Sequence, residues 1–406
     1  MKFVFFANTD WYLFNFRLST ALELKARGHE VVMLSPPGEF GARFAAYGLR
    51  WVTLDMDRAS LNPLRELVVL RDLVRILKAE RPDLLHDFTV KCSVYGALAA
   101  RIAGVPAVVN AVAGMGYVFT SDGLKARVLR PVVKLLMRST LASGNSRLIL
   151  QNPDDADAFT RSRMVPPDRI RVIRSSGVDT ARFSPVAGER GGGPLRVLLA
   201  ARLLWEKGIG DYAEASRILR GQGRQVEFLL AGMPDPGNPR SVSHEQARQW
   251  ADDGLVTWLG HVDDMPALMR SADVMALPSY YREGVPRSLI EGAATGLALV
   301  TTDLPGCREA VPQHGIDGLH VPARDPHALA RLLATLDDDR VLLRKLAVRA
   351  RENALAHFDE RSVIQRTLDV YDELLHPGGV ATDGLHAANS AVKTCLCRRS
   401  RVWSWR

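Results

Sequence analysis

The chain has 406 residues, of which 47% are hydrophobic and 24% are charged. This composition is ordinary for a folded protein, and the length predicts two domains rather than one compact core. No uncharged apolar run reaches the roughly 18 residues of a membrane-spanning helix, and the apolar run at residues 1–6 is too short for a signal peptide. Four cysteines scattered over this length favour a reducing compartment. We therefore expect a cytoplasmic protein.

The positive charge lies mainly in the first half of the chain. Residues 1–190 contain 27 Lys and Arg against 18 Asp and Glu, whereas residues 191–375 contain 21 against 26. A basic first half predicts contact with an anionic membrane or a phosphorylated substrate. No DNA-binding or RNA-binding motif is visible, so we do not expect a nucleic-acid partner.

In chain order, short aliphatic runs alternate with longer amphipathic segments, a pattern typical of βαβ units in parallel sheets. In the first half we expect one helix over 17–27, which Gly28 would end, and another over 64–80, which ends before Pro82. The strands expected there are 3–6, 30–34, 51–54, 84–86, 107–109 and 147–150.

The second half repeats this alternation after a break. Glycines and a proline within 189–194 predict a linker. The strands expected after it are 196–200, 226–231, 256–259, 274–277 and 298–301. An amphipathic helix over 357–375 would close the globular part, and residues 376–406 are expected to be a poorly ordered tail. The pattern predicts an α/β fold with two Rossmann-like domains facing across a cleft, at residues 1–184 and 195–356.

The most specific motif consists of two glutamates separated by seven residues, Glu283 and Glu291. A helix beginning near Pro286 would hold Glu291 in its first turns and leave Glu283 in the preceding loop. The helix N-terminus offers free N–H groups and a positive dipole end to a phosphate, and the glutamates could accept hydrogen bonds from sugar hydroxyls. An isolated pair with this spacing can equally be two solvated glutamates on a surface helix.

A second motif favours the functional interpretation. Arg202 and Lys207 follow the first strand of the second half, at the carboxyl end of a predicted parallel sheet, where open α/β folds bind ligands. The planar guanidinium of Arg202 can hold two phosphate oxygens while Lys207 supplies a point charge, so the pair suits a diphosphate. Because both motifs occupy strand ends of one sheet, we predict that they form one binding site.

On these residues the chain resembles the retaining glycosyltransferases of the GT-B fold, family four. The resemblance covers about residues 1–375 and includes the turn 259–262. Segments 58–63, 201–208 and 277–284 are most similar to bacterial enzymes that extend undecaprenyl-diphosphate-linked sugars. The resemblance implies transfer of a hexose or N-acetylhexosamine, with retention, from a UDP-sugar to a polyprenyl-diphosphate-linked saccharide during assembly of cell-surface polysaccharide or glycoprotein glycans.

The resemblance also implies which residues contact the donor. Glu283 would be the catalytic residue against the transferred sugar, and Glu291 would bind the ribose. The backbone near Val262 would face the base. The diphosphate would be bound by Arg202, Lys207, Gly284 and Val285.

The acceptor side departs from many members of this family. Residues 8–11 lack a glycine-rich loop after the first strand, and Ala113 stands where many members have a polar residue, before the glycines Gly114 and Gly116. We therefore do not assume a side-chain base, because the departing phosphate oxygen can itself take the acceptor proton. Lys91 follows a strand of the first sheet and is expected near the acceptor phosphates.

No metal or other cofactor is expected. Asp-x-Asp occurs at residues 55–57 and 155–157, but the first ends a strand and the second lies at a predicted helix start, where acidic residues favour the helix dipole. Arg202 and Lys207 would supply the charge compensation that a divalent ion gives in other transferases.

The segment 125–138 is a candidate for membrane contact. Arg127, Arg130, Lys134 and Arg138 would share one narrow helix face, which could lie on anionic head groups. The alternative is a surface helix that packs its apolar side on the core. With membrane contact, the protein would be peripheral on the inner face of the cytoplasmic membrane.

Other functions are compatible with a two-domain α/β architecture. A nucleotide-sugar epimerase eliminates and re-adds the diphosphate without an acceptor, although the basic first half favours an acceptor surface. A non-catalytic nucleotide-sugar binding protein would bind a donor and transfer nothing. A dinucleotide-dependent oxidoreductase is disfavoured, because no G-x-G-x-x-G opens a helix after a strand.

Overall fold

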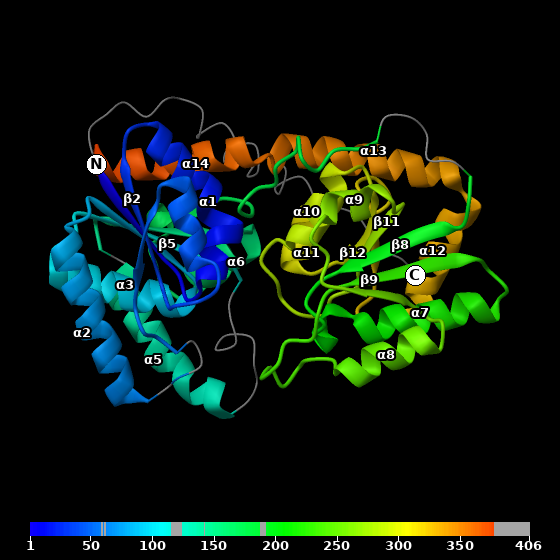
Figure 1. The fold of residues 1–406 in the computed structure, drawn as a ribbon, viewed down its shortest axis with the longest axis horizontal. Coiled ribbons are helices and arrows are strands. Elements are labelled where there is room, and N and C mark those ends of the chain that lie inside the picture. Colours follow the sequence, from blue (N-terminus) through cyan, green and yellow to red (C-terminus); the bar gives the residue numbers. More distant parts are fainter. Residues whose placement is uncertain (58–59, 61, 115–123, 142, 187–191, 377–406) are drawn as a thin grey trace, which may run out of the picture.

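The structure, a computed structural model, shows two α/β domains side by side (Figure 1). It describes residues 1–57, 60, 62–114, 124–141, 143–186 and 192–376, with the side chains of 124–129 and 132 excepted. Within these residues each domain contains one sheet, and the paired strands of both sheets run parallel. The predicted α/β class with two Rossmann-like domains is confirmed. The linker at 189–194 is described only from residue 192 on, and the tail is described only at His376.

The first domain has seven strands in the order β3-β2-β1-β4-β5-β6-β7 within the described residues. The strands are β1 (Lys2–Phe6), β2 (Glu30–Ser35), β3 (Arg50–Thr53), β4 (Leu84–Phe88), β5 (Ala107–Val112), β6 (Ser146–Leu150) and β7 (Ile170–Val172). The helices are α1 (Asp10–Ala26), α2 (Pro63–Glu80), α3 (Val90–Ala103), α5 (Leu124–Leu141) and α6 (Pro153–Arg161), with short 3-10 turns η1 (Gly41–Tyr47) and η2 (Pro167–Arg169).

The second domain has six strands in the order β10-β9-β8-β11-β12-β13. The strands are β8 (Leu195–Ala200), β9 (Val226–Ala231), β10 (Thr257–Gly260), β11 (Val274–Leu277), β12 (Ala298–Thr302) and β13 (Leu319–Val321). The helices are α7 (Ile209–Gly221), α8 (His244–Asp252), α9 (Met265–Arg270), α10 (Arg287–Ala294), α11 (Pro305–Ala310), α12 (Pro326–Asp338) and α13 (Arg340–His357), with the 3-10 turn η3 (Trp205–Lys207).

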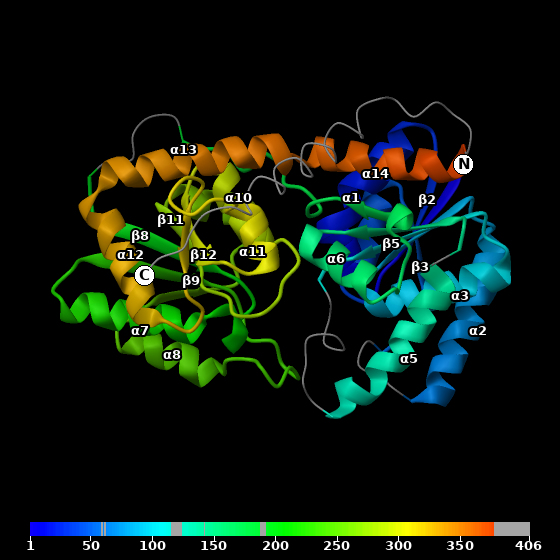
Figure 2. The same cartoon turned by 180° about the vertical axis from the view of Figure 1, so that it is seen from behind.

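The last helix, α14 (Glu360–Leu375), belongs in space to the first domain. Figures 1 and 2 show α13 along the second domain and α14 along the first, on the same side of the molecule. Apolar residues of α14, including Ile364 and Tyr371, pack into a core with Phe3 and Phe5 of β1. The helix predicted over 357–375 thus begins three residues later than expected. It covers the first sheet, because its apolar face completes the core of that domain.

The two chain crossings between the domains are hydrogen-bonded to each other. The Val178 N–H donates to the Phe358 carbonyl at 2.8 Å, and the Glu360 N–H donates to the Val178 carbonyl at 3.0 Å. Gly177, at φ +83°, lies against Glu360, where a β-carbon would come within 2.5 Å of the Glu360 Cα. The segments that leave and re-enter the first domain are thus joined at one point.

Some element boundaries differ from the predicted ones. Helix α1 begins at Asp10 rather than at residue 17, because the Thr9 hydroxyl caps it by accepting from the Tyr12 N–H at 3.1 Å. Its aromatic first turns obscured the helical period. Strands β7 and β13 were not predicted, since three residues are too few to show an alternation.

We predict that Tyr371→Phe destabilises the protein. The Tyr371 hydroxyl lies 2.6 Å from Nδ1 of the buried His86, and burial, with nearby Arg17, holds the pKa of His86 well below its usual value, so the ring is neutral. Losing the hydroxyl would leave a buried nitrogen without its partner, at a cost of about 1–3 kcal/mol. The midpoint of thermal unfolding should fall. The control Tyr47→Phe, at a side chain that is 41% exposed, should change little; equal midpoints for both variants would contradict the prediction.

Candidate active site between the domains

The predicted donor residues gather at the carboxyl edge of the second sheet. Arg202 follows β8, Val262 follows β10, and Glu283 follows β11, and these three strands belong to one parallel sheet. This edge faces the first domain: a β-carbon on Gly114, after β5, would lie 3.0 Å from the Gly284 amide nitrogen. Gly116 lies outside the described residues. The structure thus brings the carboxyl ends of both sheets together.

Lys207 and Glu283 form an ion pair at the centre of this edge. The Lys207 Nζ lies 2.5 and 2.6 Å from the two Glu283 carboxylate oxygens, and the two side chains are only 16% and 12% exposed. The hydroxyl of the buried Ser279 lies 2.9 Å from Glu283 Oε1. Gly208, at φ +77°, allows the turn that carries Lys207 to lie close to the segment after β11, because a β-carbon at Gly208 would lie 2.2 Å from the Pro278 carbonyl oxygen.

Arg202 is the solvent-accessible cation of the site. Its guanidinium donates to Asp235 Oδ2 at 2.7 Å, and 62% of its side chain is exposed. Asp235 is held in turn by the Asn238 amide at 3.2 Å, and its N–H donates to the Ser241 hydroxyl at 2.9 Å. The acidic partner therefore holds Arg202 at the strand edge while leaving most of its donors accessible.

Glu291 lies within α10, as the motif predicts. It accepts from Arg287 Nε at 2.6 Å, one turn earlier in the helix. Burial raises the pKa of the Glu291 carboxyl, although the Arg287 guanidinium lowers it. Arg287 also donates to the Asn15 carbonyl at 2.5 Å, so α10 is tied to α1 of the first domain.

The backbone between the two glutamates contacts the first domain directly. The Val285 N–H donates to Gln151 Oε1, after β6, at 3.0 Å. A β-carbon on Gly306 would lie only 1.7 Å from the Gly284 carbonyl oxygen, so the start of α11 packs on this segment without a side chain between them. Val262, half-buried, packs beside this region on the core of the second domain.

Lys91 lies in the first turn of α3, at the carboxyl edge of the first sheet. Its ammonium pairs with Glu66 at 2.9 Å and donates to the carbonyls of Asp57 and Ser60 at 2.7 and 3.2 Å. It is therefore a partnered cation, at 18% exposure, that ties the segment after β3 to α3.

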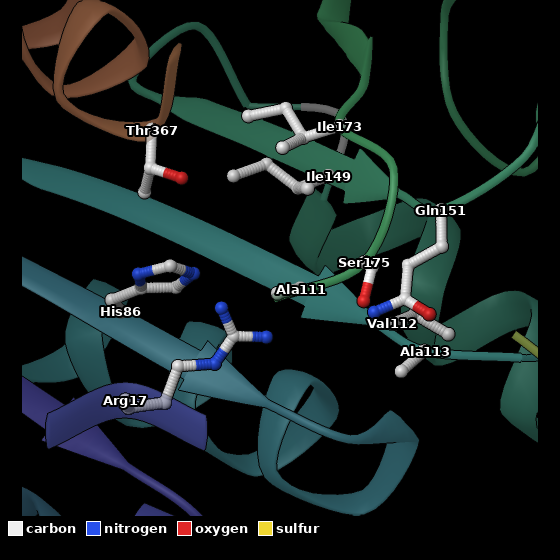
Figure 3. Close-up of a pocket in the computed structure, with 10 residues that line it drawn as sticks. All are labelled: Arg17, His86, Ala111, Val112, Ala113, Ile149, Gln151, Ile173, Ser175 and Thr367. Carbon is white, nitrogen blue, oxygen red and sulfur yellow. The ribbon is translucent and has the colours of Figure 1, made fainter. Parts of the chain in front are cut away.

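A small pocket opens beside the interface in the first domain. Figure 3 shows Arg17 and Gln151 reaching toward it from opposite sides, with His86 and Ser175 also in its lining. Arg17 is only 7% exposed; its guanidinium donates to the Tyr12 hydroxyl at 3.0 Å and lies over the Phe88 ring. Gln151 thus lines this pocket and contacts the Glu283 segment.

Three contributors to the site were not predicted. Ser279, Gln151 and Asp155 act on the Glu283 segment, and Gln151 and Asp155 come from the other domain. Only the position of Gln151 directly after a strand end offered a sequence signal. In the described residues, no group of three or more His, Cys, Asp or Glu side chains is arranged to hold a metal ion.

Two parallel-sheet domains whose carboxyl edges face each other are typical of the GT-B class of glycosyltransferase. Residues 16–175 match the family model "Glycosyl transferase 4-like domain", and residues 194–339 match "Glycosyl transferases group 1". The chain is 30% identical over 386 residues to the N,N'-diacetylbacillosaminyl-diphospho-undecaprenol alpha-1,3-N-acetylgalactosaminyltransferase of Campylobacter jejuni, covering 92% of this chain and 99% of that protein. The chain therefore belongs to the family-four, group 1 glycosyltransferases, as its resemblance predicted.

Other similarities agree with this family. The chain is 26% identical over 295 residues to the UDP-Gal:alpha-D-GlcNAc-diphosphoundecaprenol alpha-1,3-galactosyltransferase of Escherichia coli, covering 70% of this chain and 73% of that protein. HepE of Anabaena, solved in complex with UDP and glucose, superimposes with a TM-score of 0.74 at 20% identity, over 92% of this chain and 99% of that one. At this identity the structural likeness shows the GT-B fold alone.

Proposed function

We propose that the protein is a retaining glycosyltransferase that moves a hexose or N-acetylhexosamine from a UDP-sugar to a polyprenyl-diphosphate-linked saccharide. The observation that carries this proposal is the contact of Lys207 with Glu283, which joins a cation suited to a diphosphate to a carboxylate suited to a sugar. The names of both relatives specify diphosphoundecaprenol-linked substrates, and one specifies UDP-Gal. The reaction would serve polysaccharide or lipid-linked glycan assembly.

Each side chain would have a distinct task in this reaction. As the bond from the anomeric carbon to the diphosphate breaks, negative charge develops on the departing oxygen, and Arg202 and Lys207 would stabilise it. That oxygen would take the proton of the acceptor hydroxyl on the same face of the sugar, so configuration is retained. Glu283 would accept a hydrogen bond from the sugar and Glu291 from the ribose. Because two cations balance the diphosphate, we propose that no metal is required.

The acceptor would lie against the basic first domain. Lys91 is the proposed phosphate contact, since its ammonium stands at the carboxyl edge of the first sheet. Its two carbonyl contacts could be exchanged for phosphate oxygens while the ion pair with Glu66 is kept. A charged, partly buried lysine of this kind can add selectivity for a diphosphate over a free sugar.

A membrane surface would present such an acceptor, and the first domain has features that suit it. In helix α5, Leu136 and Met137 pack on the core of the first domain. Its Arg138 and Leu135 are exposed, and Leu64 at the start of α2 is 74% exposed. The N-terminal ends of α2 and α5 project from the same side of the domain (Figures 1 and 2). No helix in the described part of the chain is long and apolar enough to cross a membrane. We propose peripheral contact through the basic residues of α5, including Lys134 and Arg138.

For the donor site, we expect Arg202→Ala, Lys207→Ala and Glu291→Ala to raise the donor KM, and Glu283→Gln to lower kcat, each by roughly tenfold to a hundredfold. The first three remove binding contacts, whereas the Glu283 contact should strengthen in the transition state. Transfer rates should be measured in excess EDTA, with Arg217→Ala on α7 as a control. Unchanged kinetics in the Arg202 and Lys207 variants would refute the assignment, and a strict need for Mg²⁺ or Mn²⁺ would refute metal independence.

For the acceptor site, Lys91→Ala should raise the KM for a polyprenyl-diphosphate-linked sugar by about tenfold and leave the donor KM unchanged, because a charge-assisted contact is lost. The control is Lys78→Ala, at an exposed position on α2. If Lys91→Ala lowers thermal stability but not acceptor affinity, Lys91 only anchors the segment after β3. Equal use of the free monosaccharide would also contradict the proposed acceptor.

For membrane contact, sedimentation at low salt should show more protein bound to anionic than to neutral vesicles. Lys134→Glu combined with Arg138→Glu should weaken binding by roughly thirtyfold or more, since each basic residue at an anionic surface contributes about 1 kcal/mol before screening. Arg217→Glu combined with Arg220→Glu, on α7 of the second domain, is the matched control. Equal binding to both vesicle types, or none, would count against the proposal.

A further inference from the structure

The segment that carries Glu283 is held by the first domain on both sides. Before Glu283, the Arg282 guanidinium donates to Asp155 Oδ1 on α6 through Nε at 2.9 Å and Nη2 at 2.7 Å. After it, the Val285 N–H donates to Gln151 Oε1 at 3.0 Å. The proposed catalytic carboxylate thus stands between two contacts that cross the domain interface.

Hydrogen bonds within its own domain orient Asp155 toward Arg282. Its second oxygen, Oδ2, accepts from the Asn152 amide at 3.0 Å, and its N–H donates to Asn152 Oδ1 at 2.8 Å. Its side chain is 1% exposed, against 34% for Arg282. A buried carboxylate gains a strong, directional hydrogen bond from a guanidinium, and losing that partner is costly. This pair therefore strongly favours one position of the Arg282 backbone.

The segment has little freedom to move relative to these contacts. A β-carbon on Gly284 would lie 2.3 Å from Gln151 Oε1, so the first domain reaches the backbone beside Glu283. On the other side, the Gly284 carbonyl packs against Gly306 of α11, whose Arg308 pairs with Asp154 at 3.1 Å. Two adjacent aspartates of α6 thus bind arginines that flank the segment.

We propose that Asp155, supported by Gln151, is a positioning residue that sets the place of Glu283 only while the domains are together. Arg202, Lys207 and Glu291, by contrast, pair with side chains of their own domain, namely Asp235, Glu283 and Arg287. Nucleotide binding should therefore survive loss of the Asp155 contact, while turnover should not. This inference rests on the role proposed for Glu283. It also gives the second Asp-x-Asp tripeptide a function at the interface.

The test compares Asp155→Asn with Asp157→Asn. Asp157 lies on the same helix and carries the same charge, but it is 71% exposed and pairs only with Arg161 of its own domain among the described ion pairs. Asp155→Asn should lower kcat by roughly tenfold or more, because small misplacements of a reacting group have large effects, while the Kd for UDP by calorimetry changes less than about twofold. If Asp155→Asn behaves like Asp157→Asn, or if UDP affinity falls as much as kcat, the proposal is wrong.

A second measurement does not depend on transfer activity. Hydrogen–deuterium exchange of the peptide 279–286 should become at least severalfold faster in Asp155→Asn and in Arg282→Gln, because the Val285 N–H loses protection, and remain unchanged in Asp157→Asn. The double variant of Asp155 and Arg282 should lose no more kcat than either single variant. Unchanged exchange would overturn the positioning role even in an active enzyme. If exchange becomes faster in the variants but the unmodified protein transfers no sugar, the positioning role stands and the proposed function is refuted.

Discussion

The structure depends on one close approach, in which backbone of the second domain meets the first domain around Gly284. No side chain separates Gly284 from Gly114 on one side or from Gly306 on the other. In a parallel sheet the loops that follow the strands lie at the carboxyl edge, and here two such edges face each other. Because Glu283 lies in this contact, its position depends on both domains at once.

The charges of the site are balanced inside the protein. Lys207 is paired with Glu283, Arg202 with Asp235, and Arg287 with Glu291. An incoming diphosphate would therefore exchange one anionic partner for another rather than meet isolated cations. Such pairs keep each partly buried charge next to an opposite charge. On the proposed function, their carboxylates would become available to hydroxyl groups once the cations contact phosphate. The acidic balance of residues 191–375 is consistent with this arrangement.

Sequence patterns predicted what depends on neighbours in the chain. The alternation of short aliphatic and longer amphipathic segments predicted the two sheets. The positions of Lys207 and Glu283 after strand ends predicted that they would meet at one sheet edge. They could not give Asp155, whose partner Arg282 is 127 residues away; at a helix start, an aspartate already has a local explanation. They likewise predicted that α14 has an apolar face, but not that this face packs on the first domain. A helical period shows that a face is buried and does not show which domain covers it.

The chain crossings and the interface contacts differ in chemistry. The crossings are joined by backbone hydrogen bonds between Val178 and Phe358 or Glu360, which many changes of side chain would leave intact. The interface is closed instead by ion pairs, including Arg282 with Asp155, and by the Gln151 contact. The two crossings are therefore held by backbone, whereas the position of the Glu283 segment against the first domain depends on the particular side chains of Asp155 and Gln151.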